Sequence, residues 1–171
     1  MTAYVAFLRA VNVSGTGKLP MAELRRMGEE CGFANVRTYI ASGNLLFESK
    51  LSEAKVAGLV ADKVAKWFGK PVPVLVRSAA EMRAIADSNP FPEESGSRNF
   101  VFFLAGPPPA DFMAAVRGRE DERIAAGRRE ICVAYGEGIG KTKLVIPAVK
   151  TGTARNRNTV EKIAAMLEEQ A

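Results

Sequence analysis

The sequence predicts an α+β fold of two tandem ferredoxin-like subdomains that arose by internal duplication and pack as one compact unit. Residues 1–77 have the order strand, helix, strand, strand, helix, strand, which is the βαββαβ order of a ferredoxin-like unit. A helix and linker follow at 78–98, and residues 99–171 repeat the pattern with a C-terminal helix. The repeat is visible in the residues, because F-V-F-F-L-A-G at 100–106 matches Y-V-A-F-L-R-A at 4–10 in three of seven positions.

The hydrophobic pattern and the flanking Pro and Gly residues predict the first strand and the first helix. Residues 4–11 are apolar on both alternating faces, which is typical of a central strand covered on both sides. Pro20 fits the first turn of a helix, and Gly32 fits the position just after a helix end. The apolar stripe expected to pack on the sheet is Met21, Leu24 and Met27.

A hairpin, a second helix and a fourth strand complete the first subdomain. Strands are expected at 36–40 and 45–47, joined by A-S-G-N with Gly43 in the turn. Ser52 begins the second helix, and the fourth strand is expected at 72–76. The side chains of this helix that we expect to face the core are Val56, Leu59, Val60, Val64 and Trp67.

The connecting segment and the second subdomain carry similar signals. Ser78 is the expected cap of a short helix in the segment 78–98. After the repeated strand, a helix is expected at about 109–117, and a hairpin follows with strands at 122–125 and 130–135.

The end of the chain is less uniform. Residues 141–150 fit either a strand, favoured by the apolar run at 144–146, or a short helix capped by Thr142. In the closing helix, Asn158 and Glu161 have the spacing of a capping box. Its expected core stripe is Val160, Ile163, Ala164 and Leu167.

Composition excludes several kinds of site. The 171 residues contain no histidine, which removes Ser-His-Asp and Cys-His catalytic pairs and every His-ligated metal site. Cys31 and Cys132 lie far apart and form no CxxC pair, so we expect two small buried thiols, no metal and no cofactor. No apolar run is long enough to span a bilayer, and the apolar start is cut by Arg9 and lacks a basic leader, so we expect a cytoplasmic protein without a membrane partner.

The net charge of +5 is unevenly distributed along the chain. Residues 138–159 contain five basic residues and no acidic one, and residues 1–22 contain Arg9 and Lys18 without a carboxylate. Such segments suit anionic partners such as phosphates, nucleotides or nucleic acid, and they are equally typical of a solvated basic surface.

Four motifs occur in order along the chain: R-A-V-N-V-S-G at 9–15, A-S-G-N at 41–44, G-I-G-K-T-K-L at 138–144 and T-A-R-N-R-N-T-V at 153–160. With these motifs the sequence resembles a bacterial family known as domain of unknown function 1697. Members typically carry R-G-I-N-V-G-G and R-N-W-N-T-V, so here Ala10 and Ser14 stand in place of glycines and Arg157 in place of tryptophan. The resemblance indicates the family to which the chain is similar, and it does not indicate any particular activity.

Polar groups are expected to gather at one edge of the first sheet. Strands 1 and 3 of a ferredoxin-like unit are antiparallel neighbours, so the loop after strand 1 should open beside the hairpin that joins strands 2 and 3. Hydroxyl, amide and ammonium groups beside a helix N-terminus are a common way to hold an anion, and we expect basic residues of the second subdomain to approach this edge. The candidate ligand-binding residues are Arg9, Asn12, Ser14, Lys18, Ser42, Asn44, Lys141, Arg155 and Asn156.

The same residues also have purely structural interpretations. Asn and Ser side chains often close their own loops, and the residues at 155–158 are placed to cap the last helix. The segment G-E-G-I-G-K-T-K at 136–143 could cradle a phosphate through its glycines and lysines, and equally could be an ordinary exit from a strand.

Three functional classes therefore remain open. We expect first a protein that binds a small anion, either a phosphate-containing metabolite or a nucleotide. The alternatives are a weak, non-specific nucleic-acid-binding module, or an enzyme that acts on a phosphorylated substrate without histidine, by electrostatic stabilisation from Lys18, Lys141 and Arg155. An RNA-binding sheet is disfavoured, because residues 43–49 lack the aromatic pattern of such modules. The sequence indicates neither a catalytic residue nor an oligomeric state.

Overall fold

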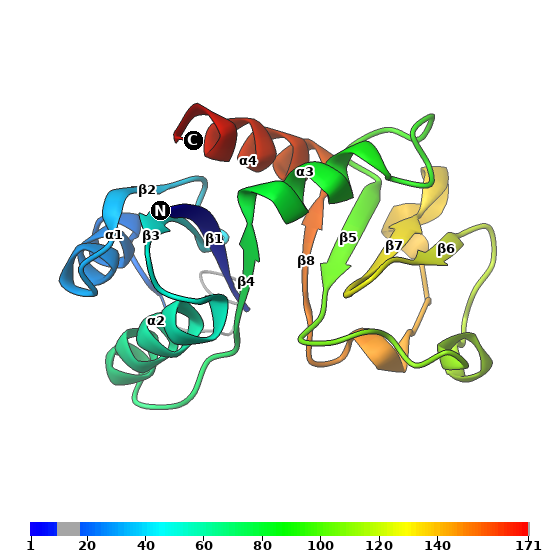
Figure 1. The fold of residues 1–171 in the computed structure, drawn as a ribbon. Coiled ribbons are helices and arrows are strands. Elements are labelled where there is room, and N and C mark those ends of the chain that lie inside the picture. Colours follow the sequence, from blue (N-terminus) through cyan, green and yellow to red (C-terminus); the bar gives the residue numbers. More distant parts are fainter. Residues whose placement is uncertain (10–17, 171) are drawn as a thin grey trace. The chain divides into compact units, whose positions relative to one another are not determined.

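The protein has a mixed α+β fold, as the sequence predicts. The computed structural model describes residues 1–9 and 18–170, which form two four-stranded antiparallel sheets and four α-helices (Figure 1). The chain divides into two compact units: the first consists of Met1–Arg83 with Ile163–Ala171, and the second of Ala84–Lys162. None of the described helices combines the length and the apolarity that a membrane span requires.

The sheet of the first unit consists of β1 (Thr2–Leu8), β2 (Ala34–Thr38), β3 (Asn44–Ser49) and β4 (Val74–Ser78). Their order across the sheet is β2-β3-β1-β4. The central strand β1 is buried from Ala3 to Leu8, so the doubly apolar pattern correctly predicted a strand covered on both faces. It pairs antiparallel with both β3 and β4, and Phe7 lies opposite Asn44.

Helices α1 (Met21–Glu30) and α2 (Glu53–Phe68) pack on one face of this sheet (Figure 1). Their ends follow the sequence signals. Ser52 caps α2 through a 3.4 Å hydrogen bond from the backbone N–H of its first turn. Gly32 and Gly69 follow the two helices with φ values of 83° and 72°, which glycine adopts without steric cost. Fully buried side chains between the helices and the sheet include Ala6, Leu8, Leu24, Leu45, Phe47, Val56, Val60 and Val64.

Two side chains of α2 were predicted to face the core and are exposed instead. Trp67 is 42% exposed and Leu59 is 36% exposed. The buried stripe of α2 advances by four residues from Val56 through Val64 to Phe68, which packs against the core. The apolar face therefore ends on Phe68, and the neighbouring tryptophan is directed outward.

Helices α3 (Ala79–Asp87) and α4 (Arg157–Gln170) both begin at polar caps. Ser78 accepts the backbone N–H of α3 at 3.2 Å, which confirms the predicted cap. In α4 the cap is Asn156, whose side-chain oxygen accepts the Thr159 N–H at 2.9 Å, two residues before the predicted Asn158.

Within the first unit, α4 is held by two arginines. Arg83 forms an ion pair with Glu168, and Arg37 donates to the Met166 carbonyl. The predicted apolar stripe of α4 is confirmed, since Val160, Ile163, Ala164 and Leu167 have no exposed surface.

The sheet of the second unit consists of β5 (Asn99–Phe103), β6 (Arg123–Ala126), β7 (Glu130–Ala134) and β8 (Thr153–Asn156). Their order is β6-β7-β5-β8. The hairpin of β6 and β7 lies within one residue of the predicted bounds. Apolar side chains that pack with this sheet include Phe112, Val116, Leu144, Ile146 and Val149.

The remaining elements of the second unit are the 3-10 helices η1 (Phe112–Ala115), η2 (Gly136–Lys141) and η3 (Pro147–Val149). The longer helix predicted at 109–117 is wrong, because Arg117 and Val145 exchange backbone hydrogen bonds of 3.0 and 2.8 Å as an isolated bridge. The same bridge settles the ambiguous segment at 141–150. Val145 pairs as a strand residue does, and a single helical turn follows it.

Candidate functional site

Backbone and side-chain hydrogen bonds bring four segments of the first unit to one edge of its sheet. The Leu8 N–H donates to the Gly43 carbonyl at 2.9 Å, which ties the end of β1 to the β2–β3 hairpin. The Arg9 N–H donates to the Pro73 carbonyl at 3.1 Å, which ties the same end to the chain before β4.

The fourth segment is the residues just before α1. The indole Nε1–H of Trp67, in the last turn of α2, donates to the Lys18 carbonyl at 2.9 Å. We call this edge the basic rim, and define it as Arg9, Lys18, residues 39–43 and residues 66–73. The described residues therefore place the end of β1 beside the first hairpin, as the βαββαβ order predicts. Asn12 and Ser14, two of the predicted ligand-binding residues, lie outside the described residues.

Two predicted site residues hold the hairpin in shape. Asn44 is fully buried, and its amide donates to the Tyr39 carbonyl at 2.9 Å and to the Ser42 hydroxyl at 3.2 Å. At the tip, Ile40 is 47% exposed and has a φ of 51°, a conformation that β-branched residues rarely adopt. The amide of Asn44 thus acts on the backbone of the hairpin, and the hairpin presents a strained, exposed tip at the rim.

The basic rim carries cations and no carboxylate. The segments 1–22, 31–47 and 63–80, which supply it, contain no Asp or Glu. The basic residues on the rim are Arg9, Lys18, Lys66 and Lys70. The three lysines are exposed, and none of them takes part in a salt bridge with another described residue.

The next carboxylate after Lys18 along the chain is Glu23, in the first turn of α1. It forms an ion pair with Arg26, and this pairing offsets its charge locally. The sequence analysis named Arg9 and Lys18 as candidate site residues and did not single out Lys66 and Lys70. The acid-free run at 63–80, together with the βαββαβ order that returns α2 to the same edge as the end of β1, could have identified them.

The other predicted site residues belong to the second unit. Lys141 is exposed at the end of η2. Arg155 is 6% exposed in β8, and its guanidinium donates to the Thr153 hydroxyl and to the Ala154 carbonyl, both at 2.8 Å. Burial lowers the pKa of Arg155 to about 10. Asn156 caps α4, as described above.

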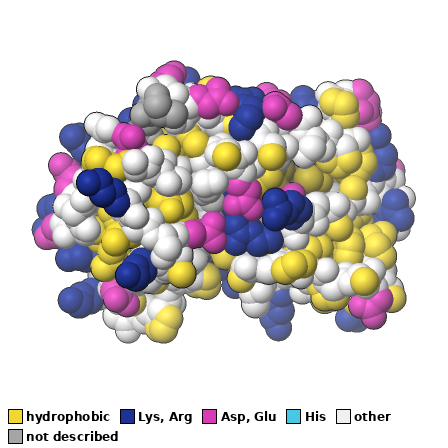
Figure 2. Space-filling view, in the orientation of Figure 1, with side chains coloured by type: hydrophobic (Ala, Val, Ile, Leu, Met, Phe, Trp, Pro, Cys, Tyr) yellow, Lys and Arg dark blue, Asp and Glu magenta, His cyan; other side chains and the backbone are white. Residues whose placement is uncertain are grey.

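The basic run at 138–159 is not a uniform surface. Arg155 is buried. Arg157 donates to the carbonyls of Phe91 and Pro92 at 3.2 and 3.0 Å, so it ties the start of α4 to a loop of its own unit. On the face that Figure 2 shows, Lys and Arg side chains are interspersed with Asp and Glu. The excess of positive charge in that segment is therefore divided between structural and exposed side chains.

The two thiols differ in burial. Cys132 is buried, and desolvation raises its pKa to about 12, so the thiolate is scarce at neutral pH. Cys31 is half-buried, and desolvation also raises the pKa of this thiol. Among the described residues, no three His, Cys, Asp or Glu side chains are grouped closely enough to hold a metal ion.

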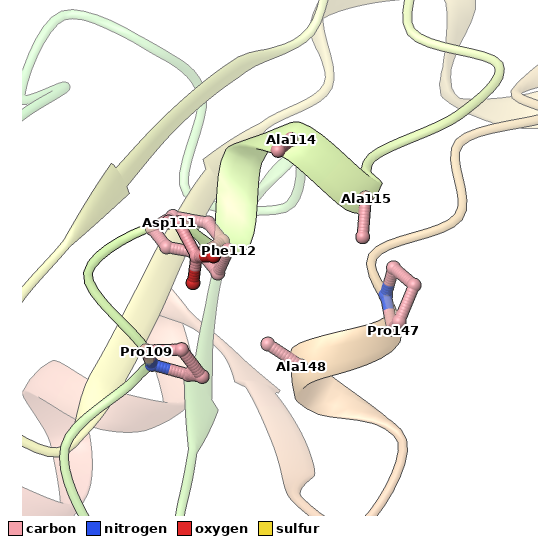
Figure 3. Close-up of a pocket in the computed structure, with 7 residues that line it drawn as sticks. All are labelled: Pro109, Asp111, Phe112, Ala114, Ala115, Pro147 and Ala148. Atoms are coloured by element: carbon pink, nitrogen blue, oxygen red, sulfur yellow. The ribbon is translucent and has the colours of Figure 1, made fainter.

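A separate cavity of about 480 Å³ lies in the second unit between η1 and η3 (Figure 3). Figure 3 shows Ala115 of η1 facing Pro147 and Ala148 of η3, and Asp111 supplies the one charge among the lining residues. An apolar cavity with a carboxylate does not suit an anion, so this cavity and the basic rim are chemically different sites.

The fold and the rim together define a small α+β protein with two antiparallel sheets and one carboxylate-free basic edge. The chain belongs to the family described as protein of unknown function, DUF1697, whose model matches residues 1–132. Its fold is similar to that of a conserved bacterial protein from Streptococcus pneumoniae, with a TM-score of 0.79 and 26% sequence identity over 97% of this chain and 98% of the other. No curated protein matches the chain.

Proposed function

We propose that the protein binds a small anion, a phosphate-containing metabolite or a nucleotide, at the basic rim of the first unit. The observation that carries this proposal is that the chain segments bearing Arg9, Lys18, Lys66 and Lys70 meet at one edge of the sheet. None of these segments contains a carboxylate. Like charges held near one another repel, and a bound anion removes that repulsion. A phosphate is the ligand class that gains most from several ammonium groups.

The residues of the rim divide into two roles in this proposal. Lys18, Lys66 and Lys70 supply mobile cationic donors, and Arg9 supplies a planar guanidinium that suits a phosphate or carboxylate. Ser42 and Asn44 act through the hairpin. Their mutual hydrogen bond and the bond from Asn44 to Tyr39 fix the turn whose tip lies on the rim. Asn44 is then a positioning residue.

A thermal-shift screen tests this function. Inorganic phosphate, sugar phosphates, nucleotides and dicarboxylates are added to the wild-type protein. A ligand that binds only the folded state at a hundredfold excess over its Kd adds about 2.7 kcal/mol, which raises the Tm of a chain of this size by about 5–10 °C. We expect at least one phosphate-bearing compound to produce such a shift.

The screen is repeated on charge variants. Lys18→Ala and Lys70→Ala each remove a cation from the rim, and we expect each to weaken binding about five- to tenfold. Lys50→Ala is the matched control, because this exposed lysine follows β3 at the opposite edge of the same sheet, where Ser49 lies opposite Thr2. Lys141→Ala removes an exposed lysine of the second unit. Equal loss in all four variants, or no stabilising anion at all, would contradict the proposal.

We also propose that both units are ferredoxin-like and descend from one duplicated βαββαβ ancestor. The support is the register of the central strands: Val5 of β1 lies opposite Arg77 of β4, and Val101 of β5 lies opposite Arg155 of β8. Both arginines are buried, at 1% and 6% exposure. The α1 and α2 positions of the second unit are occupied by 3-10 turns, so the second copy has diverged more. Aligning the first halves of family members with their second halves tests this, and a duplication predicts an optimum that pairs Val5 with Val101.

A further inference from the structure

The chain contains one tryptophan, and it lies on the basic rim. Trp67 is the penultimate residue of α2 and is 42% exposed, although the next residue, Phe68, continues the buried stripe of the helix. Its indole N–H is already satisfied by the Lys18 carbonyl at 2.9 Å. The ring is thus anchored at its polar edge and still presents apolar surface to solvent.

This anchoring distinguishes Trp67 from the other exposed apolar side chains. Ile40 and Val145 are 47% and 52% exposed, but neither has a polar group that fixes its side chain or a flat surface on which another ring can stack. A tryptophan whose orientation is set by a hydrogen bond loses little conformational freedom when a planar group stacks on it. Aromatic surface that is held in place in this way is well suited to stacking.

Three lysines neighbour Trp67, two along the chain and one through its hydrogen bond. Lys66 precedes Trp67, Lys70 follows Gly69 just beyond the helix, and the carbonyl that receives the indole N–H belongs to Lys18. An exposed ring in a segment flanked by exposed lysines matches a ligand that combines a planar base with a phosphate. A sugar phosphate would use only the lysines, and an uncharged aromatic compound would use only the ring.

We propose that Trp67 is a stacking surface for the base of a nucleotide whose phosphate is held by the lysines of the basic rim. This inference rests on the proposed anion-binding function and names the class of anion. The nucleotide is either a free mononucleotide or part of a single strand, because both present the same base and phosphate.

The test uses AMP, ribose 5-phosphate and a short single-stranded oligonucleotide as probes of the intact protein. Since Trp67 is the sole tryptophan, its fluorescence reports on this site alone. We expect saturable quenching by AMP, with excitation at the red edge of indole absorption where AMP does not absorb. By calorimetry, we expect AMP to bind about tenfold more tightly than ribose 5-phosphate, the order of magnitude that base stacking on an aromatic ring provides.

Two substitutions separate stacking from structural anchoring. Trp67→Leu removes the aromatic ring and the N–H, and Trp67→Phe keeps a smaller aromatic ring and removes the N–H. We expect Trp67→Leu to bind AMP and ribose 5-phosphate equally, and Trp67→Phe to retain most of the preference for AMP. If Trp67 serves only to anchor Lys18, both variants will change the two affinities in parallel, and the stacking proposal is wrong.

The remaining outcomes distinguish this proposal from the function on which it rests. If AMP and ribose 5-phosphate bind the wild type equally, the rim binds phosphate and Trp67 is no base subsite. If neither compound nor the oligonucleotide binds, both proposals fail. If the oligonucleotide binds the wild type but AMP does not, and if Trp67→Leu abolishes oligonucleotide binding, the stacking surface is supported. Its ligand is then nucleic acid.

Discussion

Asn44 and Glu130 occupy the same register position in the two sheets. Asn44 begins β3 opposite Phe7, and Glu130 begins β7 opposite Phe103. Each is buried, and each fixes the hairpin that precedes it. Asn44 donates to the hairpin through its amide, whereas the Glu130 carboxylate accepts the backbone N–H groups of the two residues before it, at 3.2 and 3.0 Å. The first hairpin is therefore closed by a neutral amide and the second by a carboxylate.

The first prediction concerns Asn44. Asn44→Ala removes the donors to the Tyr39 carbonyl and the Ser42 hydroxyl at a fully buried position, so we expect a loss of about 1–3 kcal/mol in the free energy of unfolding. Ser42→Ala removes one partner of the weaker bond and should cost less than about 1 kcal/mol. Urea denaturation of both variants measures the two values. A loss for Asn44→Ala no larger than that for Ser42→Ala would show that Asn44 does not hold the hairpin.

Two glycines inside helices give predictions of opposite sign. Apart from its chain neighbours and its own helix backbone, Gly58 of α2 has no atom within 4 Å of the position that a Cβ would take. Gly58→Ala should therefore stabilise the protein by about 0.5–1 kcal/mol. Gly28, in α1, would place a Cβ 2.8 Å from Cγ1 of Val36, a stiff β-branched side chain. We therefore expect Gly28→Ala to lower the Tm and Gly58→Ala to raise it. A higher Tm for Gly28→Ala would contradict the close packing of α1 on β2.

The first unit follows its local sequence signals closely because its helices and strands are bounded by residues that favour their ends. Ser52 and Gly69 bound α2, and the doubly apolar β1 lies at the centre of its sheet. The second unit departs from prediction where tertiary pairing decides. Arg117 lies in an apparently helical segment, and its bridge to Val145, far along the chain, is invisible to local propensity. The exposure of Trp67 was missed for another reason, since periodicity alone does not say which of two adjacent aromatic residues continues a buried stripe.

The candidate site could be predicted only in part from the sequence. The proximity of the first hairpin to the end of β1 follows from the βαββαβ order, and the hydrogen bond from Leu8 to Gly43 is consistent with it. The placement of Lys66 and Lys70 on the basic rim depends on where α2 ends. That position can be predicted only from the topology of the whole unit. The burial of Arg155 could not be read from its motif, because an arginine in a basic run is most often exposed.

A pH-dependent prediction concerns Glu122, which is 3% exposed. The Thr142 hydroxyl and the Glu120 backbone N–H both donate hydrogen bonds to this carboxyl. These bonds, the one from Thr142 above all, lower the pKa of Glu122 below its ordinary value of 4.5. Because the folded pKa lies below the unfolded one, the ionised carboxylate stabilises the fold above pH 4.5, and this contribution is lost as the pH falls through the folded pKa.

Glu122→Gln should therefore reduce the free energy of unfolding by about 1 kcal/mol at neutral pH, and the difference from wild type should shrink on acidification. Urea denaturation at a series of pH values measures both curves. A difference that stays constant from neutral pH to below pH 4 would mean that ionisation of Glu122 is not coupled to folding.

The central claim, that the basic rim holds an anion, is tested most directly by amide chemical shifts of the labelled protein during titration with a phosphate-bearing ligand. We expect saturable shifts at the described residues of the rim, above all at residues 41–43 and 69–70 and at Lys18. Amides around Lys50, at the opposite edge of the sheet, should stay unchanged. Shifts that gather instead around Phe112 and Ala148 at the apolar cavity, or that spread over every exposed lysine without saturation, would contradict it.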